Sequence, residues 1–138
     1  MEDYKVTKIK EYFSSILDNT IKKLNIDFLD AKIESYSLVR MPVQPIVEKW
    51  IVPIEKRREV YNFTSRKIYS KDVDTNLKNI GFYEEIETKI VQNNKNKILP
   101  EIKGIEEIEC LNCGSMQDTT NETAIFSIQI QITYREEY

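Results

Sequence analysis

A nine-residue run near the end of the chain, Phe126 to Tyr134, alternates strictly between apolar and polar side chains. Successive side chains of a β-strand point to opposite faces, so this alternation is typical of a strand with one buried face. The apolar row consists of Phe126, Ile128, Ile130, Ile132 and Tyr134. Isoleucine and aromatic residues favour strands, so the run predicts a half-buried β-strand.

The opposite row of the same run is polar but uncharged. It consists of Ser127, Gln129, Gln131 and Thr133. Strands that face water are often protected by Lys and Glu, which discourage pairing with other chains. The row therefore has two interpretations: an ordinary solvated sheet face, or a surface that hydrogen-bonds with another subunit.

The composition is that of a folded domain. The chain has 138 residues, of which 41% are hydrophobic and 31% are charged. These values and this length predict a single domain over residues 1–138. No apolar run approaches the roughly 20 residues that span a bilayer, and the start lacks the apolar segment of a signal peptide. We therefore expect a protein that is made in the cytoplasm and has no membrane partner.

The residues that are missing argue against catalysis. Histidine is absent, which removes the commonest general base and metal ligand. The three glycines, Gly81, Gly104 and Gly114, lie too far apart to form a phosphate-binding loop. The net charge is −3, without the basic stripe of a nucleic-acid-binding protein. The composition predicts a protein that is not an enzyme, needs no cofactor and does not bind nucleic acid as its primary ligand.

Two amphipathic helices are expected. Residues 7–25 carry apolar side chains at spacings of three and four, and mixed charges on the polar face favour packing on a sheet over lying on a membrane. Residues 82–97 form the second predicted helix, with Val91 on its apolar face. Glu84 and Glu85 fall in its first turns, where carboxylates stabilise the positive end of the helix dipole.

The remaining segments predict β-structure. Residues 31–70 form an irregular β region, and residues 105–135 form a C-terminal hairpin whose loop spans 112–122. In the first region the strand that contains Tyr61 and Phe63 is apolar on both faces. Such a strand is either sandwiched inside the domain or meets another subunit with its second face.

Cys110 and Cys113 form a single C-x-x-C pair. A closed zinc site needs four ligands, and the chain has no other Cys and no His, so only a site shared between subunits or completed by carboxylates is conceivable. A redox pair is expected to open a helix, whereas this pair follows a predicted strand. We therefore expect two reduced thiols and no metal site, with a metal or redox module as the alternative.

The order of several segments resembles a known family of phage proteins. The segments are 58–69 (REVYNFTSRKIY), 76–85 (NLKNIGFYEE), 98–102 (ILPEI), 105–109 (IEEIE) and 123–134 (TAIFSIQIQITY). This succession resembles the small phage proteins often labelled minor capsid protein, which belong to the tail-terminator, or tail-completion, group. The resemblance covers roughly residues 57–138, with the leading helix also in its expected place.

The resemblance implies both a fold and a role. The fold is α+β, with an antiparallel or mixed sheet, two flanking helices and an extended β-hairpin arm. The role is a virion structural protein: a ring, expected to be a homohexamer, that caps the tail tube and offers a docking surface to neck or head-completion proteins. Sheath proteins are further expected partners. The particle is a phage or a headless phage-tail-like bacteriocin, assembled in the bacterial cytoplasm.

A ring of identical subunits needs two different patches that fit each other. Large apolar side chains dominate interface energies, which suggests Ile46, Trp50 and Ile51 as anchors. Further interface candidates are Tyr61 and Phe63 and the polar row Ser127, Gln129, Gln131 and Thr133. The alternative is a small monomeric adaptor domain that binds a partner protein.

Overall fold

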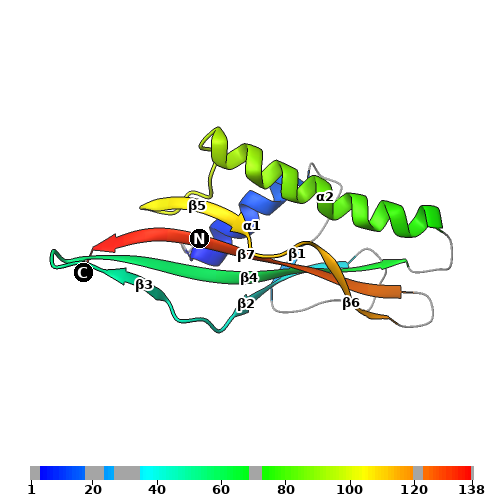
Figure 1. The fold of residues 1–138 in the computed structure, drawn as a ribbon, viewed down its shortest axis with the longest axis horizontal. Coiled ribbons are helices and arrows are strands. Elements are labelled where there is room, and N and C mark those ends of the chain that lie inside the picture. Colours follow the sequence, from blue (N-terminus) through cyan, green and yellow to red (C-terminus); the bar gives the residue numbers. More distant parts are fainter. Residues whose placement is uncertain (1–3, 18–23, 27–34, 69–72, 120–122, 138) are drawn as a thin grey trace.

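The computed structural model describes residues 4–17, 24–26, 35–68, 73–119 and 123–137. Figure 1 shows two helices on one side of a long twisted sheet. In chain order the elements are α1 (Lys5–Ile16), β1 (Leu24–Ile26), β2 (Ser35–Met41), β3 (Ile46–Lys49), β4 (Ile54–Ile68), α2 (Val73–Lys95), β5 (Ile105–Cys110), β6 (Ser115–Thr119) and β7 (Thr123–Glu137). This arrangement confirms the predicted α+β class with a mixed sheet and two helices.

The sheet is organised around β4 and β7. These two strands are antiparallel and pair at every position from Ile54↔Glu137 to Ile68↔Thr123. Fifteen residues of strand are about 50 Å long, so this pair spans the whole molecule. The path through the sheet is β1-β2-β4-β7-β5, with β3 also paired to β4 and β6 also paired to β7. Only the short β1–β2 pairing is parallel among the described strands.

The predicted alternation of the last strand is confirmed, and the strand is longer than the run that revealed it. All of its apolar row, together with Ala124, is buried. Residues paired across an antiparallel ladder share a face, so Phe63, opposite Ile128, and Tyr61, opposite Ile130, join that row. The result is a broad apolar sheet face under the two helices.

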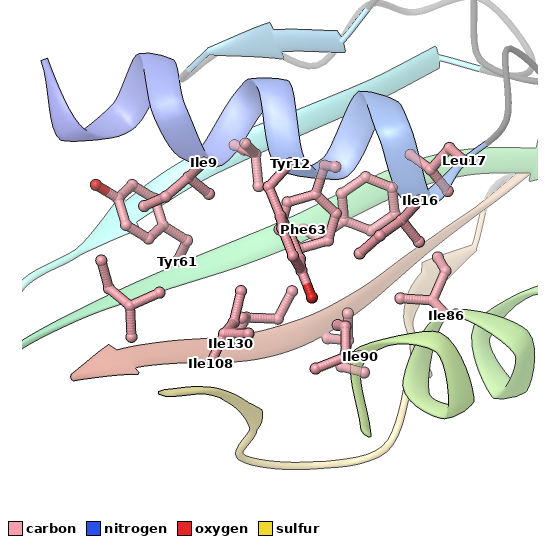
Figure 2. Packing of buried hydrophobic residues seen from close by; sticks show 14 of the residues in the cluster. Ile9, Tyr12, Ile16, Leu17, Tyr61, Phe63, Ile86, Ile90, Ile108 and Ile130 are labelled. Carbon is pink, nitrogen blue, oxygen red and sulfur yellow. The ribbon is translucent and has the colours of Figure 1, made fainter. Parts of the chain in front are cut away.

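Both helices cover this face. From α1, Phe13 stacks on Phe63, with ring centroids 5.3 Å apart and nearly parallel planes. From α2, Ile86 and Ile90 reach the same cluster, as Figure 2 shows. The amphipathic leading helix therefore packs on the sheet, as its mixed polar face predicted. Neither described helix is long and apolar enough to cross a membrane.

The free edge of β5 is occupied by a side chain from α2. The Asn94 amide nitrogen donates to the Ile108 carbonyl oxygen, and the Ile108 N–H donates to Asn94 Oδ1 at 3.1 Å. One asparagine thus replaces the next strand of the ladder at this point. This bridge blocks the middle of an edge that is otherwise a template for pairing.

The predicted helix boundaries were wrong in part. The first helix, expected over 7–25, ends at Ile16, and Leu24–Ile26 form β1, because pairing with β2 overrides the helical pattern there. Residues 18–23 of that prediction lie outside the described residues. The second helix begins at Val73 instead of residue 82. The earlier start was not predicted, because exposed side chains near the start of the helix interrupt its apolar stripe.

The longer α2 also changes the roles assigned within it. Glu84 and Glu85 lie in the middle of the helix, where they cannot complement the dipole at its start. Val91, expected in the core, is 52% exposed. Its neighbour Ile90 takes the buried position on this turn.

The C-terminal region is more than a hairpin. The expected loop over 112–122 contains β6, whose polar sequence lacks the alternation that identified β7. β5 pairs with the second half of β7 and β6 with its first half, so two strands share one long neighbour. The expected β region over 31–70 contains β2, β3 and β4; residues 31–34 and 69–70 lie outside the described part of the chain.

Candidate assembly surface

One end of the sheet extends past the helices as an arm (Figure 1). The arm consists of β3, the turn at residues 50–53, and the outer parts of β4 and β7 (54–57 and 134–137). β3 and β4 form a hairpin with the register Ile46↔Arg57 and Lys49↔Glu55, and β7 adds a third strand. The β3–β4 hairpin is therefore the projecting part of this arm.

The tip of the arm is apolar and open to solvent. Ile51 is fully exposed, and Val52 and Val47 are 55% and 45% exposed. The turn is closed by hydrogen bonds from the Trp50 N–H to the Ile54 oxygen at 3.3 Å and from the Ile54 N–H to the Val52 oxygen at 2.6 Å. Grouped exposed apolar side chains on a protein surface indicate a site of interaction.

Trp50 is held by the end of β7. The Arg135 guanidinium lies 5.2 Å from the centre of the indole ring, a cation–π contact. The same guanidinium forms an ion pair with Glu106 of β5 at 3.2 Å. Trp50 is therefore half-buried at the base of the tip, where it connects β3 to the rest of the sheet.

Charged side chains tie the strands of the arm together. The carboxylate of Glu55, which is buried, accepts a hydrogen bond from Arg57 Nη1 at 3.0 Å and lies 3.9 Å from Lys49 Nζ. Arg57 Nε also lies 3.5 Å from the carboxylate of Glu136. The buried Glu55 carboxylate thus joins β3 to β4, and Arg57 joins β4 to β7 through Glu136. These linked ion pairs favour a single conformation of the arm.

A second buried carboxylate lies where the arm joins the body. Glu59 accepts hydrogen bonds from the Tyr61 hydroxyl at 2.6 Å and the Tyr134 hydroxyl at 3.3 Å, and Arg40 Nε lies 3.8 Å away. Burial, and then the neighbouring carboxylate, raise the pKa of Tyr61. Both phenols thus remain protonated donors at neutral pH, and the cluster is a structural clamp between β4 and β7.

An open cleft of about 780 Å³ lies beside the arm. It is bounded by the end of β7, the start of α1 and the segment 101–104. Ile102 and Tyr134 supply apolar lining, and Lys5 places its ammonium 5.1 Å from the centre of the Tyr134 ring. Its charged lining is mixed in sign, so the cleft shows no preference for an ionic ligand.

The anchors expected from the sequence come together in the arm. Ile46 is half-buried in β3, Trp50 is at the base of the tip, and Ile51 is at its end. Tyr61 and Phe63 do not belong with them, because they are 1% and 0% exposed under the helices. Their assignment as interface candidates is therefore corrected: the face of β4 that carries them packs under the two helices.

The polar row of β7 lies on the face opposite the helices. Ser127, Gln129 and Gln131 are half-buried there, and Thr133 is 4% exposed. Gln131 is part of a ladder across three strands. Arg58 Nη1 of β4 donates to Gln131 Oε1 at 3.5 Å. Gln131 Nε2 in turn donates to the carboxylate of Glu109 on β5 at 3.0 Å.

The surroundings of this row could not be read from β7 alone. The row itself is uncharged, but Arg58 and Glu109 flank it on the neighbouring strands. The face is therefore a polar surface with charges on either side, not an uncharged plane. Strand order, which depends on pairing across distant segments, decides which side chains become neighbours.

Val52 in the turn and Val47 on β3 are exposed apolar residues of the arm that were not among the predicted anchors. Their signal was the apolar run from Ile46 to Ile54, interrupted only by Glu48, Lys49 and Pro53. The run lies in the irregular β region expected over 31–70. The structure places a turn in it, so consecutive apolar residues face solvent together.

The two cysteines are unequal. Cys110 ends β5 and is half-buried against the core, whereas Cys113 is exposed. Burial, followed by the charges near it, of which Glu87 is the strongest, raises the pKa of the Cys110 thiol to about 12. A thiol with this pKa is protonated at neutral pH and is a poor nucleophile. Within the described residues, no group of three or more His, Cys, Asp or Glu side chains could hold a metal ion.

Alkylation should separate the folded and unfolded environments of Cys110. In a Cys113→Ser variant we expect iodoacetamide at pH 8 to label Cys110 at least about 100-fold more slowly in the native protein than in urea. The reason is that an unperturbed thiol has a pKa of about 8.5, so far more of it is thiolate at this pH. The native rate should rise with pH throughout the range up to 12. Rapid native labelling at pH 7 would instead restore the redox hypothesis.

A scan of the chain against protein-family models gave no match, and a search of curated proteins gave none either.

Proposed function

We propose that this protein is a structural subunit that assembles with copies of itself into a ring of the tail-terminator type, capping the tail tube of a phage or phage-tail-like particle. In this role it performs no catalysis and works by surface complementarity. Neck or head-completion proteins dock on the side of the ring away from the tube. Hexameric closure is part of the proposal.

The observation that carries the proposal is the apolar tip of the arm. Ile51, Val52 and Val47 project from a hairpin that is braced by the Glu55 ion pairs and by the stacking of Arg135 on Trp50. A rigid arm loses little conformational freedom on binding, so more of the apolar burial remains as affinity. An exposed apolar tip on a braced arm is typical of a segment that is covered in an assembly.

Two further observations support the same role. The ordered segments between residues 57 and 138 resemble tail terminators, and they fall on β4, α2, the connection from α2 to β5, β5 and β7. The chemistry of the site also suits assembly, because the buried carboxylates and tyrosines brace the arm. The protonated thiol of Cys110 argues against the redox alternative.

The test is assembly of the purified chain. Light scattering after size exclusion is expected to give a closed oligomer, and negative-stain images are expected to show rings. Added to purified tail tubes from the particle encoded by neighbouring genes, the protein should bind tube ends and stop their growth. A chain that stays monomeric at high concentration and leaves tube length unchanged would sink the proposal and favour the monomeric adaptor.

A further inference from the structure

The sheet is divided into a basic and an acidic half. On one side of β7, the strands β2, β3 and β4 carry seven Lys or Arg residues against three Glu. On the other side, β5 and β6 carry three Glu and one Asp and no basic residue. The net charge of the whole chain is −3. The basic and acidic residues of the sheet lie on the two sides of β7.

The separation follows from strand order, because β7 lies between β4 on the basic side and β5 and β6 on the acidic side. Arg58 of β4 and Glu107 of β5 are both cross-strand neighbours of Thr133. Neighbouring strands are about 4.8 Å apart, so the backbones of these two residues lie roughly 10 Å apart across the sheet. At that distance, close to the screening length of physiological salt, the two charges attract each other weakly within one chain.

The face between the two halves has unused hydrogen-bonding capacity. Thr133 is 4% exposed, and its hydroxyl oxygen has no hydrogen-bond partner among the described residues. The same holds for Oδ1 of Asn62, which lies opposite Gln129 on this face. Buried polar groups normally find partners, so these two oxygens are exceptions on this face of the sheet.

We propose that the basic half of one copy, β2 to β4, docks on the acidic half, β5 and β6, of the next copy. The occupant is a second copy of this chain, because the two halves are complementary in charge. A contact between two different patches of the same protein is head-to-tail, and it closes into a ring when the rotation allows. The inference rests on the proposed self-assembly and deepens it by naming the two surfaces that meet.

Charge neutralisation tests the proposal directly. In the variant Glu107→Lys/Glu109→Lys the acidic half carries two lysines against two carboxylates, and in Lys49→Glu/Lys56→Glu the basic half carries five Lys or Arg residues against five Glu. Each variant therefore has one half without net charge, and the charge complementarity of its interface is lost. We therefore expect each variant alone to self-associate at least about 100-fold more weakly than the natural chain, measured by sedimentation velocity.

An equimolar mixture of the two variants provides the decisive measurement. In the mixture the unchanged basic half of one variant can face the unchanged acidic half of the other, so association between the two variants should recover, weakening as salt is raised. Recovery also shows that both variants are folded. Failure of the mixture to assemble, while circular dichroism shows both variants folded, would overturn the proposal.

Matched controls separate the docking surfaces from net charge. Glu84→Lys/Glu85→Lys and Lys95→Glu/Lys97→Glu make the same changes in net charge at exposed positions on and just after α2. Both controls should assemble normally, and loss of assembly in both would overturn the assignment of these surfaces. If the charge-swapped mixture assembles but the natural protein never binds tube ends, the inference survives and the tail-terminator role fails.

Discussion

Replacing Gly104 with alanine is expected to destabilise the protein by about 3 kcal/mol or more. Gly104 has a φ of +78°, a conformation that L side chains rarely adopt. A Cβ atom added there would lie 2.3 Å from the backbone oxygen of Arg135, which cannot move without breaking the sheet. The Gly104 oxygen also accepts the Arg135 N–H at 2.9 Å, just before β5 pairs with β7.

Urea denaturation followed by circular dichroism measures the effect, with Gly81→Ala as the matched control. Gly81 lies inside α2, and a Cβ added there meets nothing within 4 Å. Alanine is a better helix former, so this variant should gain about 0.5–1 kcal/mol. A Gly104→Ala protein as stable as the natural chain would show that the β5–β7 junction tolerates a different backbone path.

The parts of the fold that could be predicted are those encoded by local periodicity. The last strand was evident because its alternation is strict and one face is buried. β6 was missed because an edge strand made of polar residues has the composition of a loop. The start of α2 was missed because Leu77 and Ile80 are exposed, so its first turns present no core-facing stripe.

The candidate site was only partly predictable, for a different reason. Ile46, Trp50 and Ile51 were identified as anchors from side-chain type, and they do share the arm. The separation into a basic and an acidic half could not be seen, since it depends on β7 lying between β4 and β5. Local sequence carries residue type and periodicity, whereas the neighbours of a strand are decided by pairing over long sequence separations.

Replacing both Ile51 and Val52 with aspartate is expected to abolish ring formation and tube capping while leaving the fold unchanged. Both side chains are exposed in the single chain, so their removal should alter the free energy of unfolding by no more than about 0.5 kcal/mol. In an assembly, however, the two aspartates would be buried without partners, and the apolar anchors would be lost. The expected result is at least a 100-fold weaker self-association, measured by light scattering and negative-stain imaging.

The control that decides this prediction is a change of the same kind at the other exposed apolar pair, Leu77→Asp/Ile80→Asp on α2. These residues are 59% and 48% exposed and lie outside the arm. If the tip carries the contact, the α2 variant forms rings and caps tubes, whereas the arm variant is a folded monomer. The reverse outcome would assign the interface to α2. The arm would then be a braced projection without a role in closing the ring, and the main support for the proposed function would be lost.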